Sequence, residues 1–142
     1  NIRERSKELG MTMPEVVTLA SIIQKEAVTA SEKPVIASVF HNRLKRNMPL
    51  QSDPTAVYGI DGFRRKIMPE DLRRDSPYNT YRVQGLPPGP ICSPDKMSIQ
   101  AALWPARTSY LFFVSQGNGR HYFSRTYQEH NHAIRRSNGA SR

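Results

Sequence analysis

Residues 12–28 read Thr12-Met13-Pro14-Glu15-Val16-Val17-Thr18-Leu19-Ala20-Ser21-Ile22-Ile23-Gln24-Lys25-Glu26-Ala27-Val28. Thr12 and Glu15 have the spacing of a capping box, and Pro14 fits the first turn of a helix. The apolar positions recur with helical spacing and place four residues on one stripe: Leu19, Ile22, Ile23 and Glu26. We therefore expect an amphipathic helix from about residue 13 to Val28, with this stripe against the protein body.

Glu26 stands out because it is a carboxylate at a stripe position that calls for an apolar side chain. Burial against aliphatic groups disfavours the charged form of a carboxyl group and raises its pKa, which keeps a proton donor loaded near neutral pH. The alternative is a glutamate at the helix end that turns back to solvent or pairs with a basic residue. Position alone leaves both interpretations open.

Length and composition favour one compact domain. A chain of 142 residues can bury a real core but has little room for two. No stretch approaches the roughly 20 apolar residues that span a bilayer, and no charged-then-apolar leader opens the chain. We expect residues 1–142 to form a single soluble domain, and the start at Asn1 favours a fragment or a processed product of a longer protein.

The excess of basic residues bears on possible partners. There are 21 Lys and Arg against 12 acids, with clusters at residues 43–46, 64–66, 73–74 and 135–136. Such a surface favours an anionic partner, such as nucleic acid, phospholipid headgroups or an acidic polysaccharide, although a solvated basic face explains any one cluster equally well. A nucleic-acid-binding module is a minor alternative, because the charges are dispersed and no recognition motif is visible.

The next part of the chain predicts helices separated by loops. A second helix is expected over residues 31–46, antiparallel to the first because the connection is short. Loops and turns fill residues 47–91, with one short helical turn after Met68. The cap Ser93-Pro94-Asp95 then opens a helix that ends before Trp104.

The C-terminal third predicts a hairpin and a final helix. Residues 110–114 and 121–124 flank a loop that contains glycine, as in a β-hairpin. Thr126-x-x-Glu129 repeats the capping-box spacing and opens a helix to about Arg136, with residues 137–142 frayed. The expected fold class is α+β, with several helices packed on a small antiparallel sheet.

Neither a metal nor a cofactor is expected. Cys92 is the single cysteine, and no base lies near it in the sequence, so a half-buried loop residue is favoured over a nucleophile. His121, His130 and His132 could be considered as metal ligands. However, His130 and His132 are two residues apart on a predicted helix and do not share a face.

Polar chemistry gathers in the central loops. Residues 50–59 and 76–81 concentrate amides, hydroxyls and aromatic rings, a mixture that suits carbohydrate because rings cover apolar sugar faces and polar groups bond sugar hydroxyls. Residues 85–90, Gly85-Leu86-Pro87-Pro88-Gly89-Pro90, form a stiff turn that would hold such side chains still. Turn building alone explains these residues equally well.

Six motifs in consistent order closely resemble the YceG-like endolytic murein transglycosylases, the MltG family. They are residues 19–26, residues 37–44 (Ala37-Ser38-Val39-Phe40-His41-Asn42-Arg43-Leu44), residues 50–55, residues 76–81, residues 85–91 and residues 110–114. The resemblance covers about Met11 to Arg136. It implies a bacterial enzyme that cuts nascent peptidoglycan strands between N-acetylmuramic acid and N-acetylglucosamine.

The resemblance places the family's catalytic glutamate on Glu26. Many members carry a second acid where this chain has Gln24, so Glu26 has no local rival. The implied reaction uses Glu26 first as acid to the glycosidic oxygen and then as base to the muramic acid C6 hydroxyl, which closes on C1 as a 1,6-anhydro sugar. Asp53 would be the second carboxylate of the alternative, a hydrolytic muramidase, although a turn-forming or substrate-contacting role is favoured.

The loops and the second helix supply the candidates for the glycan cleft. They are Asn42, Arg43, Gln51, Ser52, Asp53, Tyr58, Tyr78, Asn79, Thr80, Tyr81, Gly85, Leu86 and Pro87. A helix-borne acid that faces a loop-built cleft also resembles the lysozyme-like transglycosylases, at the level of the fold.

The resemblance also implies a setting for the whole protein. Full-length relatives resemble single-pass inner-membrane proteins with a LysM-like subdomain before the catalytic one, and neither part is present in this chain. We therefore expect a longer protein anchored in the bacterial inner membrane, with the catalytic domain facing the periplasm or outer surface. Its expected partners are peptidoglycan strands and the machinery that synthesises them.

Overall fold

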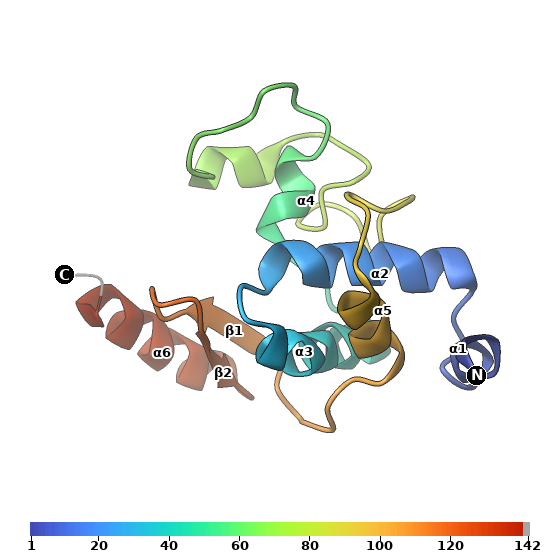
Figure 1. The fold of residues 1–142 in the computed structure, drawn as a ribbon. Helices are drawn as coiled ribbons and strands as arrows, with labels where there is room; N and C mark the ends of the chain where they lie inside the picture. Colours follow the sequence, from blue (N-terminus) through green and yellow to red (C-terminus); the bar gives the residue numbers. More distant parts are fainter. Residues whose placement is uncertain (141–142) are drawn as a thin grey trace.

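Helix α2 (Met13–Glu26) runs through the centre of the molecule, and the other elements surround it (Figure 1). The computed structural model describes residues 1–140, with side chains described to residue 138. The expected capping box is present: Thr12 Oγ1 accepts from the Glu15 N–H at 3.2 Å, and Glu15 Oε1 accepts from the Thr12 N–H at 2.9 Å. The helix ends at Glu26, two residues earlier than expected, because Ala27 is extended.

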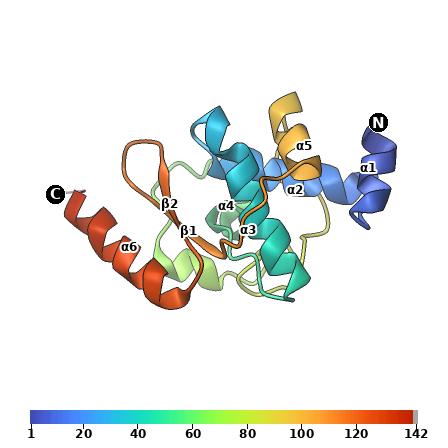
Figure 2. The same ribbon diagram turned by 90° about the horizontal axis from the view of Figure 1, so that it is seen from below.

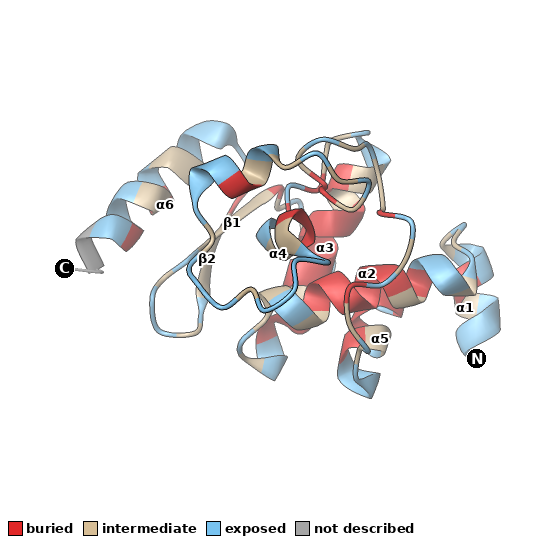
Figure 3. Ribbon diagram, turned by 90° about the horizontal axis from the view of Figure 1, so that it is seen from above, coloured by how far each residue is buried: buried red, intermediate tan, exposed pale blue. Residues whose placement is uncertain are grey.

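Helices α3 (Lys33–Lys45) and α5 (Lys96–Leu103) complete the core with α2. The core side chains are fully or almost fully buried, and the largest are Leu19, Ile22, Ile23, Ile36, Phe40, Leu50 and Leu103. Figure 3 shows that the buried residues concentrate on α2 and α3. The predicted cap of α5 is confirmed, since the Asp95 carboxylate accepts from the Ser98 N–H at 2.8 Å.

The expected antiparallel pairing of the first two long helices is wrong. Helix α3 crosses α2 instead of running back along it (Figure 2). The connection contains the extended residues Ala27 and Thr29 and the 3₁₀ turn η1 (Ala30–Glu32), which together redirect the chain before α3 begins. A short connection therefore kept the helices in contact without aligning them.

Two short helices were not predicted. Helix α1 (Ile2–Glu8) is capped by Asn1. Its sequence has no apolar stripe that could predict it, and Ser6 is its one buried residue. The Arg5 guanidinium ties it to α5 by donating to the Leu103 carbonyl at 2.8 Å. Helix α4 (Asp53–Val57) has only five residues, too few for a periodic pattern. The helical turn expected after Met68 is present as η2 (Pro69–Arg73).

The C-terminal hairpin pairs β1 (Phe112–Ser115) with β2 (His121–Ser124) in antiparallel register, Phe113 opposite Phe123. This confirms the predicted hairpin and, with the helices, the α+β class. Helix α6 (Tyr127–Ala140) packs against the sheet. It continues past Arg136, so the expected fraying is wrong for residues 137–140. The Ser137 hydroxyl donates to the Ser115 carbonyl there, and residues 141–142 lie outside the described part.

Helix length and hydropathy also bear on membrane insertion. Among residues 1–140, no helix is both long and apolar enough to cross a bilayer.

Candidate active site

A cavity of about 400 Å³ opens where the end of α2, the loop before α4, the hairpin and α6 meet. Its walls combine charged, polar and apolar side chains from six separate parts of the chain. They are Glu26, Arg43, Leu50, Gln51, Asp53, Tyr81, Phe113, Val114, Ser115, His121, His130 and Ile134. The cavity thus brings together five of the predicted site residues, which are Glu26, Arg43, Gln51, Asp53 and Tyr81.

Glu26 is the last residue of α2, and its side chain is half-buried at the cavity wall. Burial raises the pKa of its carboxyl group from 4.5 to about 7; the hydrogen bond from Ser52 lowers the pKa, and the nearby charge of Asp53 raises it. The negative end of the helix dipole acts in the same direction as burial. Near neutral pH, Glu26 is therefore present in both its acid and its carboxylate form, in line with one of the two interpretations that its position in the sequence left open.

Ser52 fixes the position of this carboxyl group. Its hydroxyl donates to Glu26 Oε1 at 2.9 Å, and its own side chain is buried. The Ser52 N–H donates to Thr80 Oγ1 at 2.8 Å, and the Thr80 and Thr55 hydroxyls are hydrogen bonded at 2.8 Å. We call Ser52, Thr55 and Thr80 the hydroxyl cluster. Thr80 does not reach the cavity, so its role here is to hold Ser52.

Asp53 and Tyr81 form a second polar pair on the cavity wall. The Tyr81 hydroxyl donates to Asp53 Oδ1 at 2.5 Å. Burial, followed by the hydrogen bond and charge of Asp53, raises the pKa of Tyr81 above its ordinary value, so the phenol stays protonated. The second carboxylate of the cavity is therefore partly occupied by a hydrogen-bond donor.

Arg43 is a buried cation that joins three parts of the cavity wall. Its guanidinium donates to the Leu111 carbonyl at 2.7 Å and to the Pro49 carbonyl at 2.9 Å, and it lies 5.2 Å from the centre of the Phe112 ring. Gln51 is exposed and has φ of +51°, a left-handed conformation that glutamine rarely adopts. Arg43 Nη1 lies 3.4 Å from Gln51 Oε1 and helps to hold it.

Gln24 faces away from the cavity. Its Oε1 accepts from the Ser98 hydroxyl at 2.7 Å, from the Asp95 N–H at 3.2 Å and from Lys33 Nζ at 3.5 Å. These contacts bind it to the start of α5, where Lys33 and Asp95 also form an ion pair at 3.0 Å. Two residues along a helix place side chains on different faces, so a polar group at position 24 does not share the surroundings of Glu26.

Several predicted cleft residues lie outside this cavity. They are Asn42, Tyr58, Tyr78, Asn79, Gly85, Leu86 and Pro87. The Asn42 amide donates to the Thr108 and Tyr110 carbonyls at 2.9 and 2.8 Å, and the Asn79 amide donates to the Leu72 and Arg74 carbonyls at 2.9 and 2.8 Å. Both side-chain amides therefore donate their hydrogen bonds to backbone carbonyls. In the structure they hold loops in place.

The aromatic and turn residues of this group also have structural contacts. The Tyr58 and Tyr78 rings lie 4.6 Å apart, and Tyr78 and Leu86 pack against the core. Pro87 is buried, and Gly85 has φ of +76°, which a side chain would strain. Contact between these residues and a longer substrate stays a prediction.

The hairpin and α6 also form walls of the cavity, which was not predicted from the sequence. These elements contribute Phe113, Val114, Ser115, His121, His130 and Ile134. The hairpin itself was predicted, but its alternation does not say which element faces it. His121 and His130 were considered only as metal ligands, and the described residues contain no group of three or more His, Cys, Asp or Glu that could hold a metal ion.

The fold and the site together define a class of domain: an α+β scaffold that presents one carboxylic acid of raised pKa to a polar cavity. The particular family is also clear. Residues 1–136 match the YceG-like family, and the chain belongs to it. The resemblance drawn from the sequence motifs is therefore confirmed.

Individual relatives agree with this assignment. The chain is 43% identical over 131 residues to the endolytic murein transglycosylase of Bacillus subtilis (strain 168), covering 92% of this chain and 36% of the relative. It is 34% identical over 134 residues to that of Streptococcus pneumoniae serotype 2, covering 90% and 24%. A crystal structure of a YceG-like protein from Listeria monocytogenes has a TM-score of 0.83 and 43% identity, covering 92% of this chain and 42% of that one. The chain thus spans less than half of each relative.

Proposed function

We propose that this domain cleaves the β-1,4 bond between N-acetylmuramic acid and N-acetylglucosamine in nascent peptidoglycan, as an endolytic lytic transglycosylase. The observation that carries the proposal is Glu26, a carboxyl group with a pKa of about 7 that faces a polar cavity. The names of the curated relatives support the same activity. No cofactor enters the reaction that we propose.

The reaction needs one group that gives and then takes a proton. Glu26 donates its proton to the glycosidic oxygen as the bond from that oxygen to C1 breaks, through an oxocarbenium-like transition state. The resulting carboxylate takes the proton of the C6 hydroxyl as the C6 oxygen bonds C1. The products are a 1,6-anhydromuramic acid end and a free hydroxyl on the departing sugar, and no water is consumed.

The surroundings of Glu26 suit both halves of this cycle. A pKa near the working pH lets one group act as acid and as base without a large free-energy cost in either direction. Ser52 donates to Oε1, and no described residue is hydrogen bonded to Oε2, which leaves that oxygen for the substrate. Ser52 therefore acts as a positioning residue.

A hydrolytic muramidase is the second candidate, because Asp53 lines the same cavity as Glu26. In that mechanism Asp53 would activate a water or bond the sugar. The Tyr81 hydroxyl already donates to Oδ1 of Asp53, so this oxygen is engaged and less available to a water or a sugar, which favours the transglycosylase reaction.

Analysis of the products separates these candidates. Uncrosslinked glycan strands are digested with the protein, and the new ends are identified by mass spectrometry. We expect anhydromuramic ends, one water lighter than reducing ends; reducing muramic acid would instead establish hydrolysis. Glu26→Gln should lower the rate by about 10³-fold or more, whereas Glu4→Gln, an exposed glutamate on α1, should not change it. Full activity of Glu26→Gln would overturn the proposal.

The setting of the whole protein is part of the proposal. A single-pass anchor in the inner membrane, with this domain on the periplasmic or outer side, would bring Glu26 to strands as they are made. The formal net charge of +9 would favour anionic headgroups or the carboxylates of peptide stems nearby. Protease accessibility of the full-length protein in intact and permeabilised cells tests this orientation, and digestion only after permeabilisation of the inner membrane would contradict it.

A further inference from the structure

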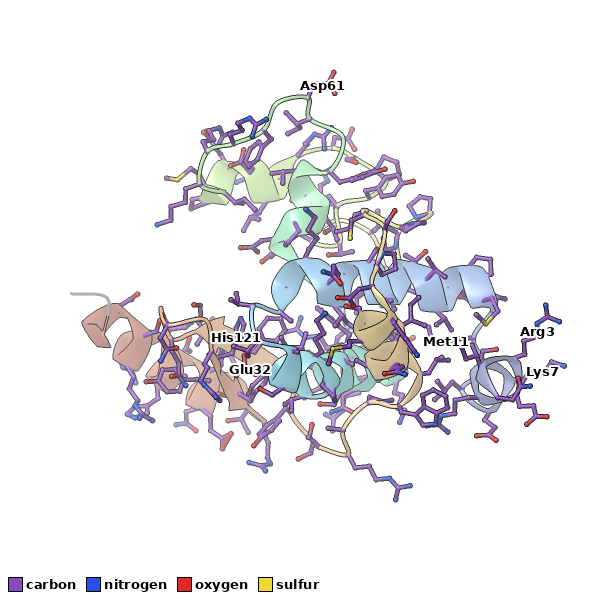
Figure 4. All side chains as sticks on the ribbon, in the orientation of Figure 1. Arg3, Lys7, Met11, Glu32, Asp61 and His121 are labelled. Atoms are coloured by element: carbon purple, nitrogen blue, oxygen red, sulfur yellow. The ribbon has the colours of Figure 1, made fainter. Side chains whose placement is uncertain are left out.

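Glu32 and His121 form a buried pair beside the cavity. Glu32 ends the 3₁₀ turn η1, His121 begins β2, and Figure 4 places their labelled side chains next to each other. His121 Nδ1 lies 2.8 Å from Glu32 Oε1, and the backbone N–H of His121 donates to Glu32 Oε2 at 3.0 Å. Both side chains are about nine-tenths buried, at 8% and 10% exposure. One histidine thus occupies both oxygens of the carboxylate.

This pairing decides which ring nitrogen carries the proton. A carboxylate can only accept, so Nδ1 of His121 must carry the hydrogen that lies against Oε1. In the neutral imidazole, Nε2 is then an acceptor. No hydrogen bond joins Nε2 to any of the described residues, and His121 lines the same cavity as Glu26. The pair therefore fixes the orientation of a cavity-lining ring whose Nε2 has no hydrogen-bond partner among the described residues.

The ring is also held by its neighbours. Its centre lies 5.3 Å from that of Phe113, nearly perpendicular to it, and 6.1 Å from that of Phe123. A purely structural tie between the hairpin and η1 would need only the backbone N–H and Nδ1 of His121. Such a tie does not account for a ring that lines the cavity with Nε2 unpaired among the described residues, beside Phe113, Val114 and Ser115 of the same hairpin.

We propose that His121 contacts the glycan directly, with Nε2 hydrogen bonded to a sugar hydroxyl, and that Glu32 is the positioning residue that holds Nδ1–H and fixes the orientation of the ring. This rests on the proposed function and adds a second substrate-contacting group to Glu26. Glu32 and His121 are 89 positions apart in the sequence. In this proposal they hold the substrate while Glu26 transfers the protons.

Three variants separate contact with substrate from a structural tie. His121→Asn keeps a donor near the place of Nδ1, so it can still bond Glu32, but it lacks Nε2. Glu32→Gln keeps one acceptor oxygen and loses the carboxylate that dictates the tautomer. His132→Asn is the matched control, because His132 is exposed on α6 and does not line this cavity.

We expect His121→Asn to lower kcat/KM for glycan cleavage by about 30-fold to 100-fold, and Glu32→Gln by about 10-fold, measured per folded molecule. His132→Asn should match the wild type. A structural role alone would lower Tm and the folded fraction in the first two variants and leave kcat/KM per folded molecule unchanged. That result would overturn the proposal.

A second measurement stands even if His121→Asn folds poorly. The histidine nitrogens of Glu26→Gln are labelled with ¹⁵N and followed by NMR as uncrosslinked glycan is added. The Nε2 signal of His121 should shift on saturation, while Nδ1 remains protonated. An Nε2 signal that does not move at saturation would overturn the proposal.

The two proposals fail in different ways. If Glu26→Gln cleaves glycan at the wild-type rate, the proposed function is lost, whatever His121 does. If Glu26→Gln is inactive but His121→Asn and Glu32→Gln are as active as the wild type, only the role of the pair is lost.

Discussion

The cavity has two sides that are built differently. On one side, Glu26 ends a helix whose residues Leu19, Ile22 and Ile23 are fully buried, and Ser52 of the hydroxyl cluster holds its carboxyl group. On the other side, the strands of the hairpin are mostly half-buried, and α6 is largely exposed (Figure 3). Glu26, the group proposed to transfer protons, is thus fixed to the core, whereas the opposite wall belongs to the periphery. This difference suggests that chemistry is held rigidly on the first side and that the second side fits the substrate.

The largest expected effect concerns Glu26, whose charged form should destabilise the folded state because the carboxyl group is buried. The folded pKa of Glu26, about 7, lies above the ordinary value of 4.5, so the folded state binds the proton more tightly than the unfolded state. The contribution of Glu26 to the free energy of unfolding is fully present below pH 4.5 and is lost as the pH rises to about 7. Glu26→Gln should therefore be more stable than the wild type by about 2 kcal/mol at pH 8, after allowance for partial exposure.

Urea unfolding at pH 4 and pH 8 measures this difference. The gap between Glu26→Gln and the wild type should nearly vanish at pH 4, where both side chains are neutral. An equal gap at the two pH values would mean that the charge of Glu26 is not the cause.

The second test removes the support of Glu26 on the core side. Ser52→Ala deletes the hydrogen bond that lowers the pKa of Glu26, so this pKa should rise above 7. The alkaline limb of the profile of kcat/KM against pH should move to higher pH, and the maximum rate should fall by about 10-fold because the carboxyl group loses its orientation. Ser31→Ala, at an exposed position of η1, is the control. An unmoved alkaline limb would contradict the assigned role of Ser52.

The third test concerns the peripheral side. Gly119 has φ of +83°, and a Cβ there would lie 3.2 Å from Cγ1 of Val28, in the turn after α2. Gly62 has φ of +67° and no atom within 4 Å of such a Cβ, so Gly62→Ala isolates the backbone strain. Gly119→Ala should lower the free energy of unfolding by about 1 kcal/mol more than Gly62→Ala does. If urea unfolding gave equal losses of free energy for the two variants, the contact between the hairpin loop and Val28 would relax without cost, which would contradict the prediction.

The smallest effect is expected at Gln24. Because this side chain faces α5 and Lys33, Gln24→Glu should change glycan cleavage by less than about twofold. The double variant Gln24→Glu, Glu26→Gln should stay as inactive as Glu26→Gln alone. Rescue of activity in the double variant would mean that position 24 can reach the substrate.

The two sides also differ in what could be predicted from the sequence. Thr12, Glu15 and the apolar stripe are local signals, and they located α2 and the misfit at Glu26 without further information. The peripheral wall depends on which element faces the hairpin, and no local pattern contains that information. The hairpin brings His121 to the cavity wall, where it pairs with Glu32, a residue 89 positions away in the sequence.

The unpredicted loop contacts have a similar cause. Asn42, Asn79 and Thr80 have the polar groups that sugars require, but each is used to satisfy backbone or hydroxyl groups in loops that have few regular hydrogen bonds. Residue type alone cannot separate an amide that meets a ligand from one that holds a loop. Helix α1 was missed for another reason: it is polar and is tied to the molecule by Arg5 rather than by an apolar stripe.

The hydroxyl cluster has a consequence for the reaction cycle. Ser52, Thr55 and Thr80 carry no group that ionises in the physiological range, so they keep the same charge whether Glu26 has its proton or not. A salt bridge in their place would bind the carboxylate tightly and resist its reprotonation. Among the described residues, the Ser52 hydroxyl is the one side-chain group hydrogen bonded to Glu26, so in the proposed reaction Glu26 can pass between its two forms without Ser52 having to change its own charge. The support of the carboxyl group is then the same at the start and at the end of each turnover.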